Sequence, residues 1–380
     1  MIKKLKRKNG VTSEIKIQRC SSCGAILQIS DPKRSGYITP SRYEKGPEPG
    51  MCDRCYNLSH FNVSNDKNYT PDYLKIVQKA KETQALVVYV LDLFTFEASI
   101  IPNLGKELPS NVLVLLNKRD VLPKGTDDKK LIDDTRRRLA IENIDPVDIV
   151  VLSSSKSLNV DNLFNLLNEH RRGKDVYFIG ASKVGKSSII NTILKQYKNE
   201  TTRMISTTHI PGTNLDVMEI PLDMNSSIYD TPGIYNPKSC INQLERHAVK
   251  YIVPQEEIII RTYTSNSNQS YLLGGIGCIN YVEGPKSTFS FHFSNDLAIT
   301  RVKMDRAEKT FASLTSTRQV KPTSEKIHSF KDLEKHEVHV PASGKIIIFI
   351  LGLGKIEFEG ANQKFEFFIP KNVGIKIFAR

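Results

Sequence analysis

One stretch, Gly180-Ala-Ser-Lys-Val-Gly-Lys-Ser187, constrains the fold of this chain more than any other. It matches G-x-x-x-x-G-K-[ST], a loop whose glycines let backbone N–H groups close around phosphate oxygens. The apolar run 175–179 before the loop predicts a strand, and the apolar spacing of 188–195 after it predicts a helix. A chance match with both flanks correct is rare. We therefore expect an α/β domain with a nucleotide site.

The loop also predicts most of the phosphate contacts. The start of the following helix adds the positive end of its dipole. Lys186 is expected to reach the β- and γ-phosphates, and the Ser187 hydroxyl to ligate Mg²⁺. The expected nucleotide contacts in this stretch are Gly180, Ser182, Val184, Gly185, Lys186, Ser187 and Ser188.

Recognition of the base is predicted from Asn117-Lys-Arg-Asp120, which follows the apolar run 111–116. In an N-K-x-D loop the Asp120 carboxylate accepts hydrogen bonds from the ring N1 and exocyclic amine of guanine, which adenine cannot offer. Asn117 would brace the loop, and the stem of Lys118 would lie over the base. Alone, this pattern most often marks a strand-end turn. Beside a phosphate loop it favours GTP and GDP, and ATP is the weakest alternative.

A serine loop, Ser153-Ser-Ser-Lys156, follows another apolar run at 147–152. It is similar to the S-A-x loop that backs guanine in GTPases, with Ser153 in the first position and Ser154 in the place of alanine. By itself it would be an ordinary serine-rich loop.

Two later segments are expected at the γ-phosphate and the metal. Asp230-Thr-Pro-Gly233 matches D-x-x-G, which places Asp230 on Mg²⁺ through water and the Gly233 N–H on the γ-phosphate. As an isolated sequence it would be a plain turn. Thr213 and Asn214, at the end of a P-G-T-N segment, are the expected contacts from the first switch.

The order of these motifs predicts a circular permutation. Ordinary GTPases run phosphate loop, switch threonine, D-x-x-G, N-K-x-D and S-A-x, whereas here the last two come first, giving the order G4-G5-G1-G2-G3. A doubly wound sheet can bear this change because the binding residues lie in loops at strand ends. The short link 171–175 joins the former last helix to the former first strand. The predicted fold class is α/β, a circularly permuted P-loop GTPase domain.

Four cysteines in two C-x-x-C pairs predict a Zn²⁺ site. Cys20, Cys23, Cys52 and Cys55 supply four thiolates, which suit tetrahedral zinc, and a filled set points to a structural site. The loop between the pairs is too rich in turn residues to fold without such a staple. A redox dithiol is the alternative for one pair, and two pairs make it a poor explanation.

Composition and charge suggest three domains. With 54 Lys and Arg against 41 Asp and Glu, the net charge of +13 favours an anionic partner, although a solvated basic surface is the simpler alternative. We expect a basic arm with a four-cysteine zinc domain at 1–68, the permuted GTPase domain at 69–245, and a basic, mostly β domain at 246–380 that binds RNA or protein.

The last of these regions is expected to contain strands at 257–263, 288–293, 345–351, 364–369 and 374–378, and a helix near 304–314. Its alternating phenylalanines at 289, 291 and 293, and at 365 and 367, are interpreted as core residues rather than base-stacking platforms. Cys240 and Cys278 have no close Cys or His partner in the sequence and are expected to be either buried or without a function.

The cellular compartment is predicted from what the sequence lacks. The sequence contains no run of 18 apolar residues, so no membrane span is predicted. The basic start at 1–9 has no apolar core of the kind found in a secretory signal, and it suits an RNA-contacting arm better than a transit peptide. Paired cysteines in a chain of this size indicate a reducing compartment. The cytoplasm is expected, ahead of the mitochondrion.

Over nearly its whole length the chain resembles the YqeH-type circularly permuted GTPases. The resemblance is carried by the leading four-cysteine region and the motifs above, and by Gly173-Lys-Asp-Val-Tyr177, Asp216, Gly274-Gly275, Phe293-Ser-Asn-Asp296 and Gly352-Leu-Gly354. It implies slow GTP hydrolysis, with GTP or GDP, Mg²⁺ and structural Zn²⁺ bound, and a role in assembling the small ribosomal subunit through rRNA or ribosomal protein. Two alternatives remain: an RNA-binding protein that uses GTP as a ligand with little hydrolysis, and a zinc-stabilised structural protein with a vestigial nucleotide fold.

The expected catalytic set is Lys186, Ser187, Asp230 and Gly233, joined by Lys183. Where Ras-like enzymes place a water-orienting Gln after D-x-x-G, this chain has Ile234. The resemblance implies that several such GTPases use K⁺ held partly by a phosphate-loop Asn, but that position is Lys183, so K⁺ is doubtful. Asn214 also replaces the second Thr of P-G-T-T, an expected Mg²⁺ ligand. Either the Lys183 ammonium supplies charge near the β/γ bridge, or it is solvent-exposed and the machinery has decayed.

Overall fold

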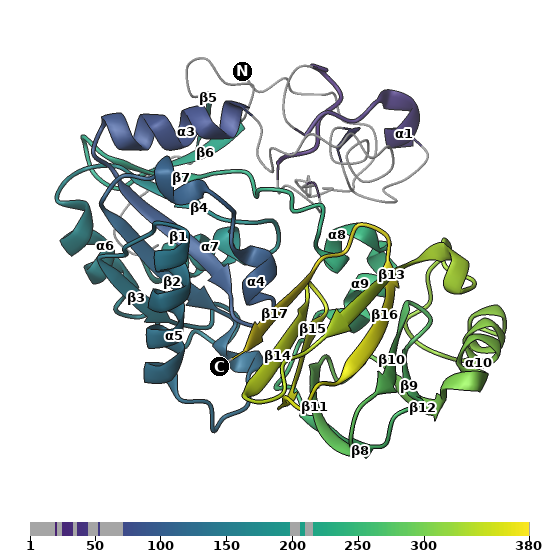
Figure 1. The fold of residues 1–380 in the computed structure, drawn as a ribbon. Coiled ribbons are helices and arrows are strands. Elements are labelled where there is room, and N and C mark those ends of the chain that lie inside the picture. The colour runs from purple at the N-terminus through teal and green to yellow at the C-terminus, as the bar shows by residue number, and fades with distance from the viewer. Residues whose placement is uncertain are drawn as a thin grey trace.

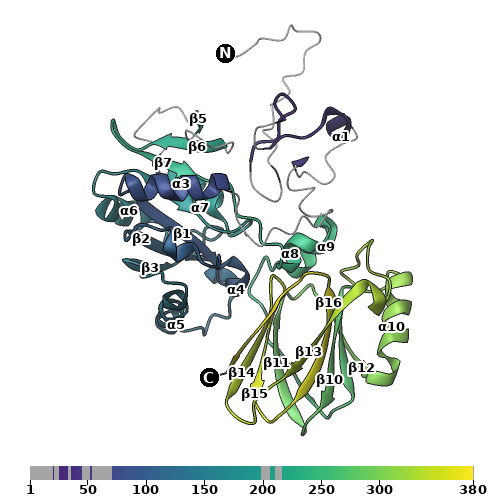
Figure 2. The ribbon, with the colours of Figure 1, turned by 45° about the horizontal axis from the view of Figure 1, so that its top comes forward.

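A computed structural model describes residues 20, 25–32, 36–44, 52–53, 71–197, 206–209 and 216–379. Most of them form two bodies, an α/β region built on one seven-stranded sheet and a β region built on two five-stranded sheets. The two regions lie against each other, with the short helices α8 and α9 at their junction (Figures 1 and 2). Within the described residues, no helix combines the length and apolar character that crossing a membrane requires.

The α/β sheet has the strand order β3-β2-β1-β4-β7-β6-β5. Its parallel strands are β1 (Leu86–Asp92), β2 (Val112–Asn117), β3 (Asp148–Val151), β4 (Val176–Ile179) and β7 (Ser227–Asp230), and the antiparallel edge consists of β6 (Asp216–Pro221) and β5 (Ser206–His209). Every residue of β1, β2 and β4 is buried, as expected for parallel strands covered on both faces. The long apolar runs in the sequence therefore became the central strands.

Helices cover both faces of this sheet. Alternate residues of β1, such as Val87 and Tyr89, share one core cluster with α3 (Pro71–Glu82) and α5 (Asp128–Ile141). The intervening residues, such as Val88, share a second cluster with α6 (Leu163–Arg171) and α7 (Lys186–Tyr197). Shorter helices occur at α1 (Pro40–Glu44), α4 (Phe96–Ser99), η1 (Leu104–Lys106) and η2 (Arg119–Val121). The result is a three-layer α/β/α arrangement with loops free at the strand ends.

The β region pairs two antiparallel sheets, β12-β9-β10-β16-β13 and β17-β14-β15-β11-β8. Their bounds are β8 (Arg261–Ser265), β9 (Gln269–Leu273), β10 (Gly277–Glu283), β11 (Ser287–Phe293), β12 (Ile299–Lys303), β13 (Leu333–His339), β14 (Lys345–Ile350), β15 (Gly354–Glu359), β16 (Lys364–Pro370) and β17 (Ile375–Ala379). Helix α10 (Met304–Ser316) packs beside β9, β10 and β12, and η3 (Phe330–Asp332) precedes β13. One core cluster draws residues from both sheets.

Aromatic side chains fill this core. Phe289, Phe291 and Phe293 on β11 and Phe365 and Phe367 on β16 are all at least 97% buried and contact one another. The prediction that these rings are core residues is confirmed. Their burial removes them as stacking platforms for bases.

One predicted strand is wrong in part. The sequence predicts a single strand over 257–263, but β8 begins only at Arg261. Ile258 instead packs with Phe94 and Val121 of the α/β region, and its N–H donates to Val121 O at 2.9 Å. Ile258 therefore packs at the junction between the regions rather than in a sheet, while Ile259 and Ile260 are exposed.

The chain passes between the two regions through α8 (Cys240–Gln243) and α9 (Arg246–Ile252). Backbone hydrogen bonds tie this passage to two loops of the β region: Cys240 N–H donates to Leu351 O at 2.8 Å, and Gly374 N–H donates to Lys238 O at 2.9 Å. A Cβ on Gly352 would lie 2.2 Å from Ser239 Oγ. The contact is thus too close for any side chain at that glycine.

Candidate functional site: a phosphate loop and a base-reading loop

The phosphate loop connects β4 to α7 in the conformation that its sequence predicts. Gly180 and Gly185 have φ values of +146° and +101°. A Cβ on Gly180 would lie 2.5 Å from Val90 O, and one on Gly185 would lie 2.2 Å from Asn117 Nδ2. Both glycines are therefore required by the close approach of neighbouring strands. Ser182, Val184 and Ser188 lie on the same loop and on the first turn of α7.

Lys186 is buried at the first position of α7, and its ammonium is held by the loop itself. Its Nζ donates to Gly180 O at 3.0 Å and to Ala181 O at 3.2 Å. The ammonium thus lies inside the curve of the loop, where a phosphate group would compete for its protons.

Ser187 and Asp230 lie side by side although they are far apart in sequence. The Ser187 Oγ donates to Asp230 Oδ2 at 2.6 Å, and Asp230 is 7% exposed at the end of β7. A hydroxyl and a carboxylate are the oxygen ligands that Mg²⁺ prefers. The donor set therefore fits the metal that the motifs predict.

The segment after Asp230 pairs directly with the phosphate loop. Ile234 N–H donates to Gly180 O at 3.0 Å, and Ser182 N–H donates to Ile234 O at 2.8 Å. Gly233 lies so close to this loop that a Cβ there would be 2.7 Å from Ser182 Cα. The D-x-x-G glycine and the phosphate loop are thus neighbours, as the predicted site requires.

Asn117, the first residue of the N-K-x-D loop, connects this loop to the phosphate loop and to the serine loop. Its Nδ2 donates to Val184 O at 2.9 Å, and its Oδ1 accepts from Ser154 N–H at 3.1 Å. The side chain is 1% exposed. A single buried amide therefore braces the phosphate loop and the serine loop against the end of β2, which is the bracing role that we predicted for it.

Asp120 has one oxygen engaged and one available. Its Oδ2 accepts from Ser155 Oγ at 2.8 Å. Its Oδ1 is buried and has no hydrogen-bond partner among the described residues. Leaving a buried carboxylate oxygen unsatisfied is costly, and a guanine base would supply the missing donors. Ser153, the first residue of the serine loop, is fully buried, and its Oγ shares a hydrogen bond with Ser155 Oγ at 3.1 Å.

Lys118 is held by a carboxylate that the sequence did not single out. Its backbone is left-handed, with φ +67°, and its Nζ lies 2.5 Å from Asp92 Oδ2 at the end of β1. Asp92 is 2% exposed and also accepts from Phe94 N–H at 2.9 Å. Asp92 therefore positions the lysine whose stem was expected over the base.

Lys183 lies in the phosphate loop and has a left-handed backbone, with φ +66°. The pKa of its ammonium is lowered to about 8, first because the neighbouring chain displaces water from the ammonium. Positive charge on Lys118 and Arg246 lowers the pKa further, while negative charge on a Cys20 thiolate raises it. The residue still exposes part of its surface to solvent. The lysine thus belongs to a group of cations that would favour an anion.

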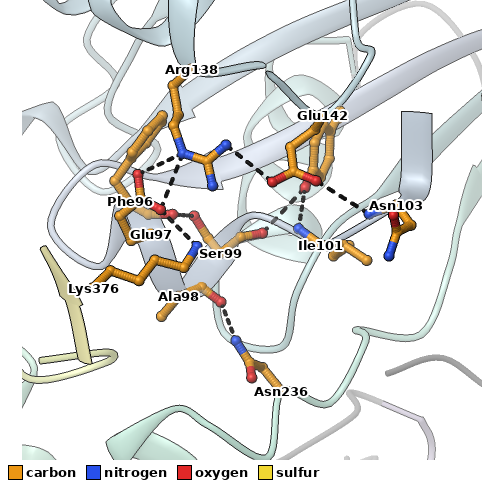
Figure 3. Close-up of polar contacts among 11 residues, drawn as sticks. Phe96, Glu97, Ala98, Ser99, Ile101, Asn103, Arg138, Glu142, Asn236 and Lys376 are labelled. Atoms are coloured by element: carbon orange, nitrogen blue, oxygen red, sulfur yellow. Dashed lines mark hydrogen bonds and ion pairs between the residues drawn. The ribbon is translucent and has the colours of Figure 1, made fainter. Parts of the chain in front are cut away.

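Helix α4 connects this site to the β region (Figure 3). Glu97, 4% exposed, accepts from Arg138 Nε at 3.0 Å and pairs with Lys376 Nζ of β17 at 2.8 Å. The Ala98 carbonyl accepts from Asn236 Nδ2, shortly after D-T-P-G, at 2.8 Å. One turn of helix therefore contacts both the β region and the segment that follows Asp230-Thr-Pro-Gly233, which corresponds to the second switch of GTPases.

Other predicted residues fall outside the described part of the chain. Thr213, Asn214, Cys23 and Cys55 are among them. Cys20 and Cys52 are described, both are buried, and the Cys52 N–H donates to Cys20 Sγ at 3.3 Å. Within the described residues, no group of three or more His, Cys, Asp or Glu side chains could hold a metal ion.

Sequence reasoning missed the roles of Asp92 and Ser155. Each acts on a predicted motif through a contact that no short pattern encodes, and Asp92 lies 26 residues before Lys118. The position of Asp92 at the end of a buried strand, next to the strand that carries N-K-x-D, was the available signal.

A strand order of β3-β2-β1-β4-β7-β6-β5, with base-reading loops that precede the phosphate loop in sequence and meet it in space, defines a circularly permuted P-loop GTPase. Residues 78–239 match the family model described as RsgA GTPase, and residues 286–379 match the model described as YqeH-like, C-terminal. An uncharacterized protein, YqeH of Bacillus subtilis (strain 168), is 33% identical over 363 residues, covering 95% of this chain and 98% of that protein. The chain belongs to the YqeH family.

More distant relatives come from plants and animals. NO-associated protein 1, chloroplastic/mitochondrial, of Arabidopsis thaliana is 26% identical and covers 90% of this chain and 69% of its own length. Nitric oxide-associated protein 1 of Homo sapiens is 24% identical over 92% of this chain, but this chain spans only 58% of the human protein. Family membership implies that the chain binds GTP, GDP and Mg²⁺ and acts as a GTPase.

Proposed function

We propose that this protein is a guanine-specific, slowly hydrolysing GTPase that acts in assembly of the small ribosomal subunit and binds rRNA or ribosomal protein in a nucleotide-dependent way. The observation that carries its guanine specificity is the pair Asn117 and Asp120. Asn117 braces both neighbouring loops, and Asp120 keeps a buried oxygen without a partner among the described residues. The ribosomal role follows from the resemblance to YqeH-type proteins.

The phosphate and metal roles are assigned by position. Lys186, Gly185 and the loop N–H groups would hold the phosphates, while Ser187 and Asp230 would hold Mg²⁺. When bound, Mg²⁺ neutralises charge on the phosphate oxygens. Gly233 would approach the γ-phosphate from the side of Ser182. Thr213 and Asn214 would complete the site from the first switch.

Slow hydrolysis is supported by the surroundings of Ile234. Its side chain is 5% exposed and belongs to the core cluster on the α3 face of the sheet. A buried aliphatic group cannot orient an attacking water, so that function must come from elsewhere. The same observation favours a second candidate, a GTP-dependent RNA-binding module with little or no hydrolysis of its own.

We also propose the domain limits 1–68, 69–245 and 246–380, with a structural zinc site in the first. The backbone bond from Cys52 N–H to Cys20 Sγ supports this site, because N–H donors to sulfur stabilise thiolates that bind metal. Cytoplasmic localisation is part of the proposal, although the Arabidopsis relative is named chloroplastic/mitochondrial.

Nucleotide state would reach the β region through residues 233–250. Asn236 contacts α4, and the backbones of Lys238 and Cys240 form hydrogen bonds with loops of the β region. A shift of Gly233 toward a γ-phosphate would therefore pull on backbone that the β region holds.

A binding and turnover experiment tests the proposal. Labelled GTP and GDP are titrated with ATP as competitor, and GTP turnover is measured with and without small ribosomal subunits. Micromolar GTP binding that ATP does not displace, with turnover raised by the subunits, is expected. Tight binding with no turnover in either condition would favour the second candidate, and absence of GTP binding would overturn both.

A further inference from the structure

Tyr73, in the first turn of α3, places its hydroxyl between the phosphate loop and the D-T-P-G segment. The side chain is 3% exposed and packs in the core cluster on that face of the sheet. Gly180 N–H donates to the hydroxyl at 3.3 Å, and the hydroxyl lies 3.5 Å from Thr231 Oγ1. A side chain from a third element thus contacts both phosphate-sensing segments.

The direction of these hydrogen bonds can be deduced. The Thr231 Oγ1 donates to Phe178 O at 2.7 Å, which uses its single proton. The Tyr73 hydroxyl must therefore donate to Thr231, and its lone pair accepts from Gly180 N–H. Burial raises the pKa of this phenol well above its usual range, so the proton stays on the oxygen. The chain of donors runs one way from Gly180 through Tyr73 and Thr231 to β4.

Two members of this hydrogen-bond chain, Gly180 and Thr231, belong to the segments that carry the expected metal ligands. Gly180 carries the carbonyl that accepts from Lys186 Nζ and from Ile234 N–H. Thr231 directly follows Asp230, whose carboxylate bonds Ser187. A change in spacing between Gly180 and Thr231 would therefore change the separation of the two groups expected to hold Mg²⁺.

We propose that Tyr73 is a positioning residue, whose hydroxyl sets the spacing between the phosphate loop and Asp230 and so tunes Mg²⁺-dependent binding of GTP. This inference rests on the proposed metal roles of Ser187 and Asp230. Without the hydroxyl, the Gly180 N–H would lose its acceptor in a buried setting, and each loop would shift to find another. Hydrogen bonds of 3.3 and 3.5 Å are long, so the expected effect is moderate.

The experiment is a MgCl₂ titration of fluorescent GTP binding to the full-length Tyr73→Phe variant. We expect the half-saturating Mg²⁺ concentration to rise about three- to tenfold, the range for one lost hydrogen bond. The matched control is Tyr89→Phe. Tyr89 is fully buried, and its hydroxyl accepts from Ile101 N–H at 2.8 Å and donates to Ser99 O at 3.3 Å. These bonds go to α4 and the residues just after it, not to either phosphate segment. Its Mg²⁺ requirement should match that of the unaltered protein.

A second variant covers the case in which Tyr73→Phe does not fold. Thr231→Val removes the next hydroxyl in the chain and should raise the Mg²⁺ requirement in the same direction. The double variant should resemble the more affected single variant, because both changes break one chain. If the unaltered protein shows no Mg²⁺ dependence, the metal roles of Ser187 and Asp230 fail. If it does, and Tyr73→Phe and Thr231→Val both behave like Tyr89→Phe, the positioning role alone is overturned.

Discussion

Lys376 of β17 forms an ion pair with Glu97 of α4, with Nζ and Oε2 2.8 Å apart. The pair joins the last strand of the β region to the turn of helix that also bonds Asn236. Since Glu97 is nearly fully buried and Arg138 contacts it as well, the carboxylate has a cation from each region. The two regions therefore share one network of charged groups, which lies beside the segment that follows Asp230-Thr-Pro-Gly233.

Replacing Lys376 should weaken the coupling of the β region to the nucleotide. Lys376→Met removes the charge but keeps an apolar stem, and it should lower the free energy of unfolding by about 1 to 2 kcal/mol, because Glu97 keeps Arg138. Hydrogen exchange across β14 and β17 should differ between GTP-analogue and GDP forms in the unaltered protein. This difference should shrink in Lys376→Met, which keeps the backbone bonds of Lys238 and Cys240 to the β region.

The control for this prediction is Lys364→Met. Lys364 of β16 pairs with Glu283 of β10, so this ion pair lies within one sheet of the β region, and both side chains are exposed. Its nucleotide-dependent exchange should match that of the unaltered protein. Persistence of the full difference in Lys376→Met would show that the ion pair is not part of the route.

Asp120→Asn should shift the base preference from guanine toward xanthine. In Asp120→Asn an NH₂ group replaces one carboxylate oxygen, so the side chain donates a hydrogen bond where the carboxylate accepted one. Xanthine has a carbonyl where guanine has its exocyclic amine, and this carbonyl can accept that bond. GTP affinity should fall by about 100-fold or more, with xanthosine triphosphate gaining. Competition titrations with GTP and xanthosine triphosphate measure this change.

Asp127→Asn is the matched control for the base switch. Asp127 caps α5 by accepting from Lys129 N–H at 2.9 Å, and asparagine caps helices equally well. It should leave base preference unchanged. Unaltered GTP preference in Asp120→Asn would place the guanine pocket elsewhere in the protein.

The α/β region was predictable because motif and burial coincide there. The apolar runs at 111–116 and 175–179 could only be central strands, and each ends in a loop whose spacing carries chemistry. The serine loop and the D-x-x-G loop were predictable for the same reason, because each follows a strand and lies at the same edge of the sheet. The contacts that fix these loops, such as Asp92 to Lys118 or Tyr73 to Gly180, join residues distant in sequence, and one sequence gives no sign of them.

The β region was less predictable for a physical reason. β13, Leu333–His339, is a strand with polar or charged residues at most positions, because only its buried face contributes to the core. The strands β9, β10, β12, β13 and β15 were all missed. The apolar run 258–260 predicts a strand, although Ile258 packs at the junction and Ile259 and Ile260 are exposed. In antiparallel sheets the partner strand, more than the local pattern, decides what becomes a strand.

The cysteine pairs should hold one structural Zn²⁺ per chain. Elemental analysis of the native protein should find it, and Cys52→Ser should lose it, together with the fold of the first ~70 residues and ribosome association, while GTP binding remains. Cys278→Ser is the control, since Cys278 is buried in the β region, where its Sγ donates to Asn280 Oδ1 at 3.2 Å and a serine hydroxyl can do the same. Native protein without zinc would end the proposal.

The last prediction concerns Lys183, which occupies the position where K⁺-dependent relatives are expected to carry Asn. The ammonium stands near Lys118 and Arg246, a group of like charges that an incoming phosphate would relieve. If Lys183 supplies the charge that K⁺ gives elsewhere, exchange of KCl for NaCl should leave hydrolysis unchanged. Lys183→Asn should then lower turnover in NaCl and recover part of it in KCl.

A pH series tests the same charge independently. Because the pKa of Lys183 is lowered to about 8, the free protein loses this charge as pH rises from about 7 to about 9, while a bound triphosphate favours the charged form. As the pH rises from about 7 to about 9, the GTP affinity of the unaltered protein should therefore fall. This fall should exceed the one measured for Lys183→Asn over the same pH range by up to about tenfold. Lys174→Asn, which removes an exposed charge just before β4, should follow the unaltered protein. Strong K⁺ stimulation of the unaltered protein, or equal pH profiles for it and Lys183→Asn, would refute a cation built into the phosphate loop.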